Sequence, residues 1–205
     1  MLAKMGSRRV LVYHDYVPDN RRARNEDLRN ELAGGRFLAI ASHGGHPLER
    51  LEVEAAAVGR DADAGVSLVI SGPTEKLQGR VAKLALPANV RYAGFLKREV
   101  YESLKASADF ALNITDEPFT LSHVLFEFAA SSLPVVSSRQ EVVEDLFGDS
   151  LVYADSTVED VAAKVRELCS GHSRDEWAAK IARKQDELTE MHSQEVASLR
   201  GLVSG

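Results

Sequence analysis

The segment Asp109–Ser138, DFALNITDEPFTLSHVLFEFAASSLPVVSS, indicates the fold of this chain more clearly than any other. It begins with an apolar strand, Phe110–Ile114, and continues through a polar loop, Thr115–Phe119. A helix is expected over Leu121–Ser132 and a second apolar strand over Pro134–Ser137. Open α/β sheets bind ligands at such a place, because the strand ends open a crevice and the helix N-terminus favours an anion.

One acidic residue, Glu127, lies within the otherwise apolar helix of this segment. A carboxylate on an apolar helix costs free energy unless it is paired or binds a ligand. From this position Glu127 could accept a hydrogen bond from a sugar hydroxyl at the strand ends. The alternative is an exposed position that faces solvent. We take Glu127 as the first candidate for ligand binding.

The alternation of strands and helices continues over most of the chain. The strands lack the in–out alternation of apolar and polar residues, which is typical of strands covered by helices on both faces. The sequence therefore predicts a doubly wound parallel α/β sheet of about six strands. Its further strands are expected at Phe37–Ala41, Val66–Ile70, Val90–Ala93 and Leu151–Tyr153, and the helix after the first of these at about Leu48–Val58.

Three parts are expected along the chain. Residues 1–36 contain an N-terminal strand, Arg9–Tyr13, and a hinge-like linker with a helix over Arg21–Leu32. Residues 37–172 form a single Rossmann-like domain, and residues 173–205 form a C-terminal helix.

The last two helices have the spacing of capping boxes at their starts, Ser156 with Glu159 and Ser173 with Glu176. The C-terminal helix also carries a narrow apolar stripe on a charged surface. That stripe must pack on the sheet, on a partner or on a second copy of the chain, so self-association is expected. It consists of Trp177, Ile181, Leu188, Met191, Val196 and Leu199.

Composition excludes several classes of protein. A length of 205 residues fits one domain with appendages, and the net charge of −6 argues against nucleic acid as a partner. No apolar run approaches the ~20 residues that span a bilayer, and no signal-peptide pattern is present, so we expect a cytoplasmic protein without a transmembrane segment. The single cysteine, Cys169, excludes an intrachain disulfide and a multi-cysteine zinc site.

Arginines cluster at positions 21, 22 and 24. They could contact anionic lipid or a phosphate. A solvated linker is the favoured interpretation, because acidic residues are interleaved with them at Asp19, Glu26 and Asp27.

The run EFAASSLPVV (Glu127–Val136) resembles the E-A-x-A-x-G-x-P-V-V segment of family-4 glycosyltransferases of the GT-B fold. Three other segments resemble landmarks of that family in the same order: VSLVISGP (Val66–Pro73), NVRYAGFL (Asn89–Leu96) and EVYESLKASAD (Glu99–Asp109). In the family, these segments belong to the C-terminal domain, which holds the nucleotide-sugar donor.

The resemblance implies a site for a UDP- or GDP-sugar, with no metal and no cofactor besides that ligand. Glu127 matches the second glutamate of the family's Glu-seven-residues-Glu motif, which binds the donor's ribose hydroxyls. The first glutamate of the motif falls on Phe119, and the nearest acids, Asp116 and Glu117, could reach the sugar instead. The other expected donor-binding residues are Thr120, Leu121, Ser122, His123, Ser42, His43, Gly44, Gly72, Phe95 and Leu96.

Several of these residues have a structural alternative. Thr120 could be a helix N-cap without a ligand. For His123 a hydrogen bond to Glu127, one helical turn away, is favoured over a donor contact. Gly72 could be a turn glycine and Phe95 a core residue.

The loop SHGGH, residues 42–46, has glycines that let the backbone approach a phosphate, although a plain polar loop is the alternative. Family members usually carry an arginine here and a lysine shortly after it. The matching places hold His43 and His46, and a neutral histidine stabilises a diphosphate less well than a fixed cation. A two-histidine metal site is conceivable, but no carboxylate falls at ligand spacing. The other cations that could substitute are Arg50, Lys97 and Arg98.

The resemblance implies the donor-binding half of a retaining glycosyltransferase, which moves a sugar from the nucleotide to an acceptor hydroxyl. Its catalytic residues are unknown from the sequence. Arg9–Pro18 resembles the strand that joins the two halves of such enzymes, so we expect an N-terminal acceptor domain or subunit as partner and no transfer by the isolated chain. The alternatives are a non-catalytic GT-B-derived binding or assembly module, favoured by the missing loop cations, and half of a sugar-nucleotide epimerase.

Overall fold

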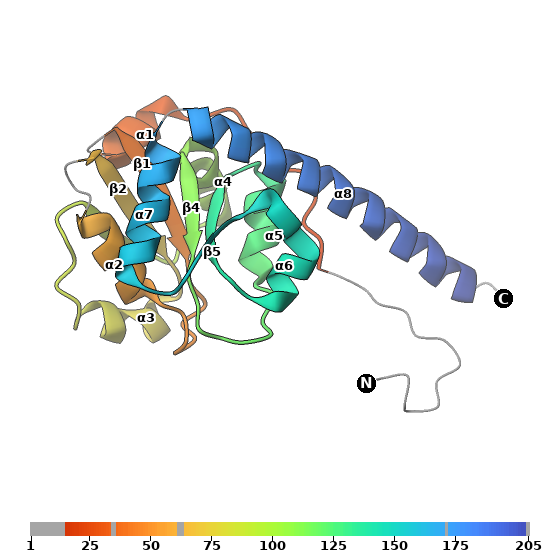
Figure 1. Ribbon diagram of the computed structural model, residues 1–205, viewed down its shortest axis with the longest axis horizontal. Coiled ribbons are helices and arrows are strands. Elements are labelled where there is room, and N and C mark those ends of the chain that lie inside the picture. Colours follow the sequence, from red (N-terminus) through yellow and green to blue (C-terminus); the bar gives the residue numbers. More distant parts are fainter. Residues whose placement is uncertain (1–14, 34–35, 61–63, 171, 204–205) are drawn as a thin grey trace.

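The computed structural model describes residues 15–33, 36–60, 64–170 and 172–203 (Figure 1). Within this part of the chain, six strands form one parallel sheet in the order β3-β2-β1-β4-β5-β6. The strands are β1 (Phe37–Ser42), β2 (Val66–Ser71), β3 (Val90–Gly94), β4 (Phe110–Asn113), β5 (Val135–Ser138) and β6 (Val152–Ala154). The predicted doubly wound parallel α/β fold is thus confirmed, with strand bounds within about two residues of those expected.

Helices follow the strands as the sequence pattern predicts. They are α1 (Glu26–Ala33), α2 (Leu51–Arg60), α3 (Thr74–Val81), α4 (Arg98–Ser107), α5 (His123–Ala130), α6 (Glu141–Phe147), α7 (Val158–Cys169) and α8 (His172–Val203), with a 3₁₀ turn at Gly148–Ser150. No helix in the described residues is both long enough and apolar enough to cross a membrane.

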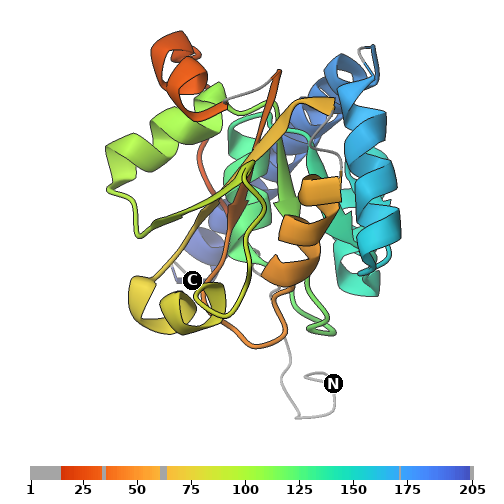
Figure 2. The same ribbon diagram turned by 90° about the vertical axis from the view of Figure 1, so that its left-hand side faces the viewer.

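The core consists of two apolar layers, one on each face of the sheet. Along β1, Ala39 and Ala41 belong to the layer under α2 and α7, whereas Leu38 and Ile40 belong to the layer under α4, α5, α6 and α8. Figure 2 shows the sheet between α2 and α7 on one side and α4 on the other. Strands covered on both faces need no polar side, which explains their continuous apolar character.

The order of the strands places a crevice at the centre of one sheet edge. From β1 the chain proceeds outward to β2 and β3, then returns to add β4 on the other side of β1. The helices that follow β1 and β4, α2 and α5, therefore diverge to opposite faces of the sheet. In open α/β sheets this divergence is where ligands bind.

Three helix starts differ from those expected. The first helix begins at Glu26 rather than Arg21, because residues 15–25 run as an extended segment against α5 and α8. Helix α2 begins at Leu51 rather than Leu48, since Glu49 forms an antiparallel bridge with Thr115.

Helix α5 begins at His123 rather than Leu121. Phe119 has a positive φ of 61°, and Ser122 is extended as the N-cap without a side-chain cap hydrogen bond. Thr120 and Leu121 therefore lie before the helix and are not its first turn.

The capping boxes predicted for the last two helices are wrong. Thr157 is the N-cap of α7, and its hydroxyl accepts a hydrogen bond from the Asp160 N–H at 3.3 Å. The Ser156 hydroxyl instead contacts that of Ser138, at 3.1 Å. Helix α8 begins at His172, so Ser173 lies inside its first turn. The predicted strand Arg9–Tyr13 lies outside the described residues.

The apolar stripe of α8 packs mainly on the chain's own domain. Ile181 and Leu188 are fully buried in the layer with α5, and Trp177 packs on the opposite layer. The far end of α8 extends beyond the body of the domain (Figure 1), where Leu199 is exposed. Self-association through this helix stays a prediction that concerns only its last turns.

The extended segment 15–25 is docked on the domain. The Asn20 N–H donates to the Ala130 carbonyl at 2.8 Å, the Gln185 amide donates to the Val17 carbonyl at 2.9 Å, and Arg24 pairs with buried Asp109 at 2.7 Å. The favoured interpretation of a solvated linker is therefore wrong for Arg24.

Candidate donor site

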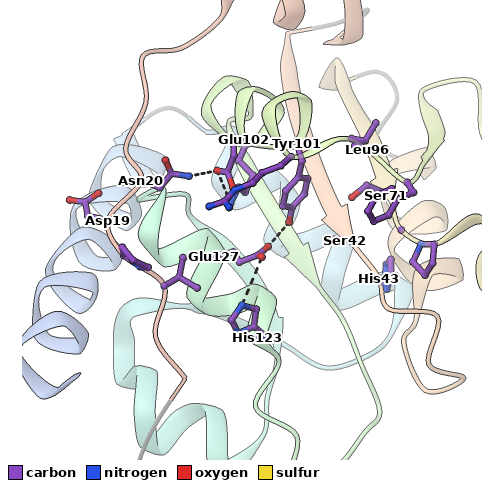
Figure 3. A pocket seen from close by; sticks show the side chains of 17 residues that line it. Asp19, Asn20, Ser42, His43, Ser71, Leu96, Tyr101, Glu102, His123 and Glu127 are labelled. Atoms are coloured by element: carbon purple, nitrogen blue, oxygen red, sulfur yellow. Dashed lines mark hydrogen bonds and ion pairs between the residues drawn. The ribbon is translucent and has the colours of Figure 1, made fainter. Parts of the chain in front are cut away.

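A cavity of about 620 Å³ opens at the carboxyl ends of β1 and β2. Its walls come from the ends of these strands, from α4 and α5, and from the docked N-terminal segment (Figure 3). The residues that line it are Val17, Pro18, Asp19, Asn20, Ser42, His43, Ser71, Gly72, Pro73, Phe95, Leu96, Arg98, Tyr101, Glu102, Lys105, His123 and Glu127.

Glu127 faces this cavity from α5 because the rest of that helix is turned to the core. Leu125, Phe126 and Phe128 are fully buried on both sides of it in the sequence. The Tyr101 hydroxyl donates to Glu127 Oε2 at 2.9 Å, and His123 Nε2 lies 3.9 Å from Oε1 (Figure 3). The carboxylate thus has one fixed partner and stays open toward the cavity, with 29% of its side chain exposed.

Tyr101 was not identified from the sequence, although it is central to the site. Burial, and next the negative charge of Glu127, raise the pKa of the Tyr101 hydroxyl above its ordinary value. The phenol therefore stays protonated at neutral pH and donates to the carboxylate. Lys105 Nζ lies 4.8 Å from the centre of the Tyr101 ring, a cation–π distance.

A buried ion pair forms another part of the cavity wall. Lys105 Nζ lies 3.1 Å from Glu102 Oε2, and Asn20 from the docked segment also hydrogen-bonds Glu102. A Glu–Lys pair three residues apart is typical of an exposed helix face, so no local pattern indicates that these side chains are buried. Arg98 also lines the cavity, and no ion-pair partner for it exists among the described residues.

His43 is buried beside the cavity. Its Nε2 lies 2.6 Å from Glu54 Oε2, and its Nδ1 lies 3.7 Å from Glu49 Oε2. Burial alone would lower the pKa of His43, but the nearby charges of Glu54 and Glu49 outweigh it and raise the pKa to about 10. The expectation of a neutral histidine is therefore wrong: His43 is a cation at neutral pH, with two carboxylates beside it.

The glycine loop after His43 binds an anion that belongs to the chain itself. The backbone N–H groups of Gly44, Gly45 and His46 donate to the Glu49 carboxylate at 2.7, 2.8 and 2.9 Å. Successive N–H groups that converge in this way form an anion-binding nest. The glycines of this loop indicated that its backbone could approach a phosphate, with a plain polar loop as the alternative, and neither interpretation included Glu49 as the bound anion.

Position 72 requires glycine because the backbone there lies very close to the backbone of His43. A Cβ at this position would lie 2.3 Å from the His43 carbonyl oxygen. Gly72 therefore lets the ends of β1 and β2 converge at the cavity.

Six of the residues expected to contact the donor do not line the cavity. Asp116 pairs with Arg50, and Glu117 Oε2 lies 2.9 Å from His46 Nδ1. Neither acid lines the cavity, because these pairs hold the loop after β4 against the loop after β1. Thr120, Leu121 and Ser122 do not line it either, since α5 begins later than expected. Gly44 lies next to the cavity but not in its wall.

The remaining expected contacts meet at the cavity. Glu127, His123, Ser42, His43, Gly72, Phe95 and Leu96 all line it, and Phe95 is 78% exposed at its rim. Among the described residues, no group of three or more His, Cys, Asp or Glu side chains is placed to hold a metal ion.

The sequence profile of the glycosyl transferase-like family matches residues 50–197, which is most of the chain. The chain belongs to this family. The match includes α4 and α5, the helices that form the Tyr101–Glu127 wall of the cavity. A comparison with curated protein sequences found no significant match.

Solved glycosyltransferases share the fold at low sequence identity. Anabaena HepE, in a complex with UDP and glucose, superposes with a TM-score of 0.73 at 15% identity, over 97% of this chain and 59% of HepE. WaaG, a glycosyltransferase of lipopolysaccharide biosynthesis, gives 0.66 at 16% identity, over 87% of this chain and 52% of WaaG.

A UDP-forming trehalose-phosphate synthase from Burkholderia vietnamiensis gives a TM-score of 0.65 at 15% identity, over 85% of this chain and 47% of the synthase. The chain therefore spans only about half the length of these GT-B proteins, and its fold is that of one Rossmann-like half.

Proposed function

We propose that this chain is the nucleotide-sugar-binding half of a retaining glycosyltransferase. The observation that carries the proposal is the Glu127 carboxylate, which is held by Tyr101 at the wall of a 620 Å³ cavity on the switch-point edge of the sheet. A carboxylate there can accept a hydrogen bond from a ribose hydroxyl. The volume lies within the range of roughly 300–1,000 Å³ that is typical of small-ligand pockets.

The charges in the cavity suit a nucleoside diphosphate. Arg98 has no carboxylate partner in the described residues, and Lys105 and His123 also line the cavity. Arg98 thus replaces the loop cations as the group available to a diphosphate. HepE, which shares the fold, was solved with UDP and with UDP-glucose, so UDP-glucose is the first probe.

An acceptor-binding half must complete the enzyme. The structural relatives are longer than this chain, which covers 59% of HepE and 52% of WaaG. Closure of two domains excludes water and aligns the acceptor in such sites. We therefore expect the isolated chain to bind the donor weakly and to transfer no sugar.

One observation favours a second candidate, a non-catalytic binding module. The nest after β1 is occupied by Glu49, and the charge of His43 is balanced by Glu49 and Glu54. The β1 loop thus offers no free cation to a leaving diphosphate. Donor hydrolysis or transfer in the presence of an acceptor-domain partner separates this candidate from the transferase.

The test is calorimetry with UDP-glucose and GDP-mannose on the wild type and on Glu127→Ala. We expect dissociation constants of roughly 0.1–1 mM for the preferred donor, because one half of a two-domain cleft lacks the opposing wall and leaves much of the ligand surface exposed. Glu127→Ala is expected to weaken binding about tenfold, the value of one hydrogen bond to a charged group. Glu141→Ala, which removes an exposed glutamate from α6, is the control. Equal binding by the wild type and Glu127→Ala would refute the proposal.

A further inference from the structure

Glu127 does not face the cavity with two equivalent oxygens. Oε2 is engaged by the Tyr101 hydroxyl at 2.9 Å, whereas among the described residues the one polar partner near Oε1 is His123 Nε2, at 3.9 Å. The first contact is a hydrogen bond, whereas the second is too long to be one. The side chains lie in this order in Figure 3, with Tyr101 above Glu127 and His123 below it.

The Tyr101 side chain is itself held in place. It projects from α4, with Lys105 against its ring and the Ser42 hydroxyl near its own hydroxyl. It therefore bridges the end of β1 and helix α5 through one phenol group. A half-buried donor of this kind can fix the rotamer of a carboxylate that would otherwise sample several.

We propose that Tyr101 is the positioning residue for Glu127: it fixes Oε2, so that Oε1 accepts a hydrogen bond from one ribose hydroxyl and the site distinguishes ribonucleotides from their deoxy forms. This inference rests on the proposed donor site. Discrimination follows because a ligand without that hydroxyl leaves a positioned carboxylate oxygen unpaired in a partly buried site.

A Tyr101 that positions Glu127 and a Tyr101 that only stabilises the fold affect ligand affinities differently. If Tyr101 only stabilises α4, its loss weakens the binding of UDP and deoxy-UDP alike. If it positions Glu127, its loss weakens UDP binding and leaves the binding of the deoxy analogue unchanged. The ratio of the two affinities therefore separates the two roles, whatever the effect on stability.

The experiment measures dissociation constants for UDP, 2′-deoxy-UDP and 3′-deoxy-UDP by calorimetry. The wild type is expected to prefer UDP about tenfold over one of the deoxy forms, as one charged hydrogen bond predicts. Tyr101→Phe is expected to reduce this preference to about threefold or less, while the affinity for that deoxy form changes less than about twofold.

Two further variants make the test specific. The double variant Tyr101→Phe, Glu127→Ala should show the same preference for UDP over its deoxy forms as Glu127→Ala alone, because Tyr101 acts only through Glu127. Tyr153→Phe is the matched control, since it removes a hydroxyl that contacts the Val143 carbonyl, away from the cavity. It should keep the preference of the wild type.

The outcomes separate this inference from the proposed function. A wild type that prefers UDP, together with a Tyr101→Phe variant that keeps the full preference, would overturn the role of Tyr101 and leave the donor site standing. Equal weakening for all three ligands in Tyr101→Phe would also overturn it. A wild type that binds no UDP at millimolar concentration would overturn both.

Discussion

The loop after β1 and the helix pair α4–α5 form two walls of the same cavity, and they satisfy their polar groups in different ways. In the β1 loop the partners are internal: His43 pairs with Glu54, and Glu49 accepts three backbone hydrogen bonds. On the helix wall, Glu127 has one partner and Arg98 has none among the described residues.

This difference shows which wall is prepared for a ligand. A polar group with all its hydrogen bonds made inside the protein gains little from a ligand, because binding must first break a contact of equal value. A positioned carboxylate with one open oxygen gains a full hydrogen bond. The β1 loop therefore acts mainly as a structural support, whereas α4 and α5 supply recognition.

The largest expected effect is the loss of stability when Glu54, the partner of His43 in the β1 loop, is replaced. Its side chain is completely buried, and its two oxygens bind His43 Nε2 and the Ile114 N–H. Glu54→Ala removes the closer of the two carboxylates beside the buried His43 cation, and we expect it to lower the free energy of unfolding by about 3 kcal/mol. Denaturant unfolding measures this loss. Glu52→Ala, on the exposed side of the same helix, should cost less than about 1 kcal/mol.

The pH dependence of the free energy of unfolding tests whether the positive charge on His43 is what makes its pairing with Glu54 stabilising. The pKa of His43 is about 10 in the folded protein and 6.5 as its ordinary value. Because the folded pKa is the higher one, the pair's contribution is complete below about pH 6.5 and is lost as the pH rises toward 10. The free energy of unfolding should fall over this range with a slope of up to about 1.4 kcal/mol per pH unit. A slope that is unchanged in His43→Gln would contradict this account.

A smaller effect is expected when the Glu49 carboxylate is removed from the anion-binding nest of residues 44–46. In Glu49→Ala, the N–H groups of Gly44, Gly45 and His46 lose their internal acceptor and become available to an external anion. We expect the affinity for inorganic pyrophosphate to rise about tenfold, the value of a charged hydrogen bond. Calorimetry with pyrophosphate measures it. Glu52→Ala removes a nearby negative charge and leaves the Glu49 carboxylate in the nest, so an equal rise in that variant would assign the gain to net charge alone.

The fold was predictable because the strands and helices have strong local patterns. The strands VSLVIS and FALN are mainly apolar and almost entirely buried, and short polar loops separate them from amphipathic helices. Helix starts were less predictable, since they depend on distant contacts. Leu51 begins α2 only because residue 49 pairs with residue 115, which no local sequence pattern reveals.

The candidate site was predictable where a charged residue lies within an otherwise apolar helix. Glu127 differs from its apolar neighbours on α5, and this contrast marked it. Tyr101 and Lys105 were missed because α4 reads as an ordinary amphipathic helix, with nothing to show that the docked segment 15–25 covers its polar face. Glu49 was missed because an acid near a phosphate loop gives no signal that it fills that loop.

The smallest expected effect concerns Phe119, the position where the family's first glutamate would stand. Phe119 is 79% exposed, has φ 61°, and does not line the cavity. A carboxylate placed there points away from the donor, so Phe119→Glu should change the affinity for UDP-glucose by less than about twofold, as for an ordinary surface substitution. Phe119→Ala separates loss of the ring from gain of the charge. A rise of fivefold or more in Phe119→Glu alone would show that the loop after β4 moves to bring position 119 to the sugar. The Asp116–Arg50 and Glu117–His46 pairs would then have to open on binding, and recognition would no longer be confined to α4 and α5.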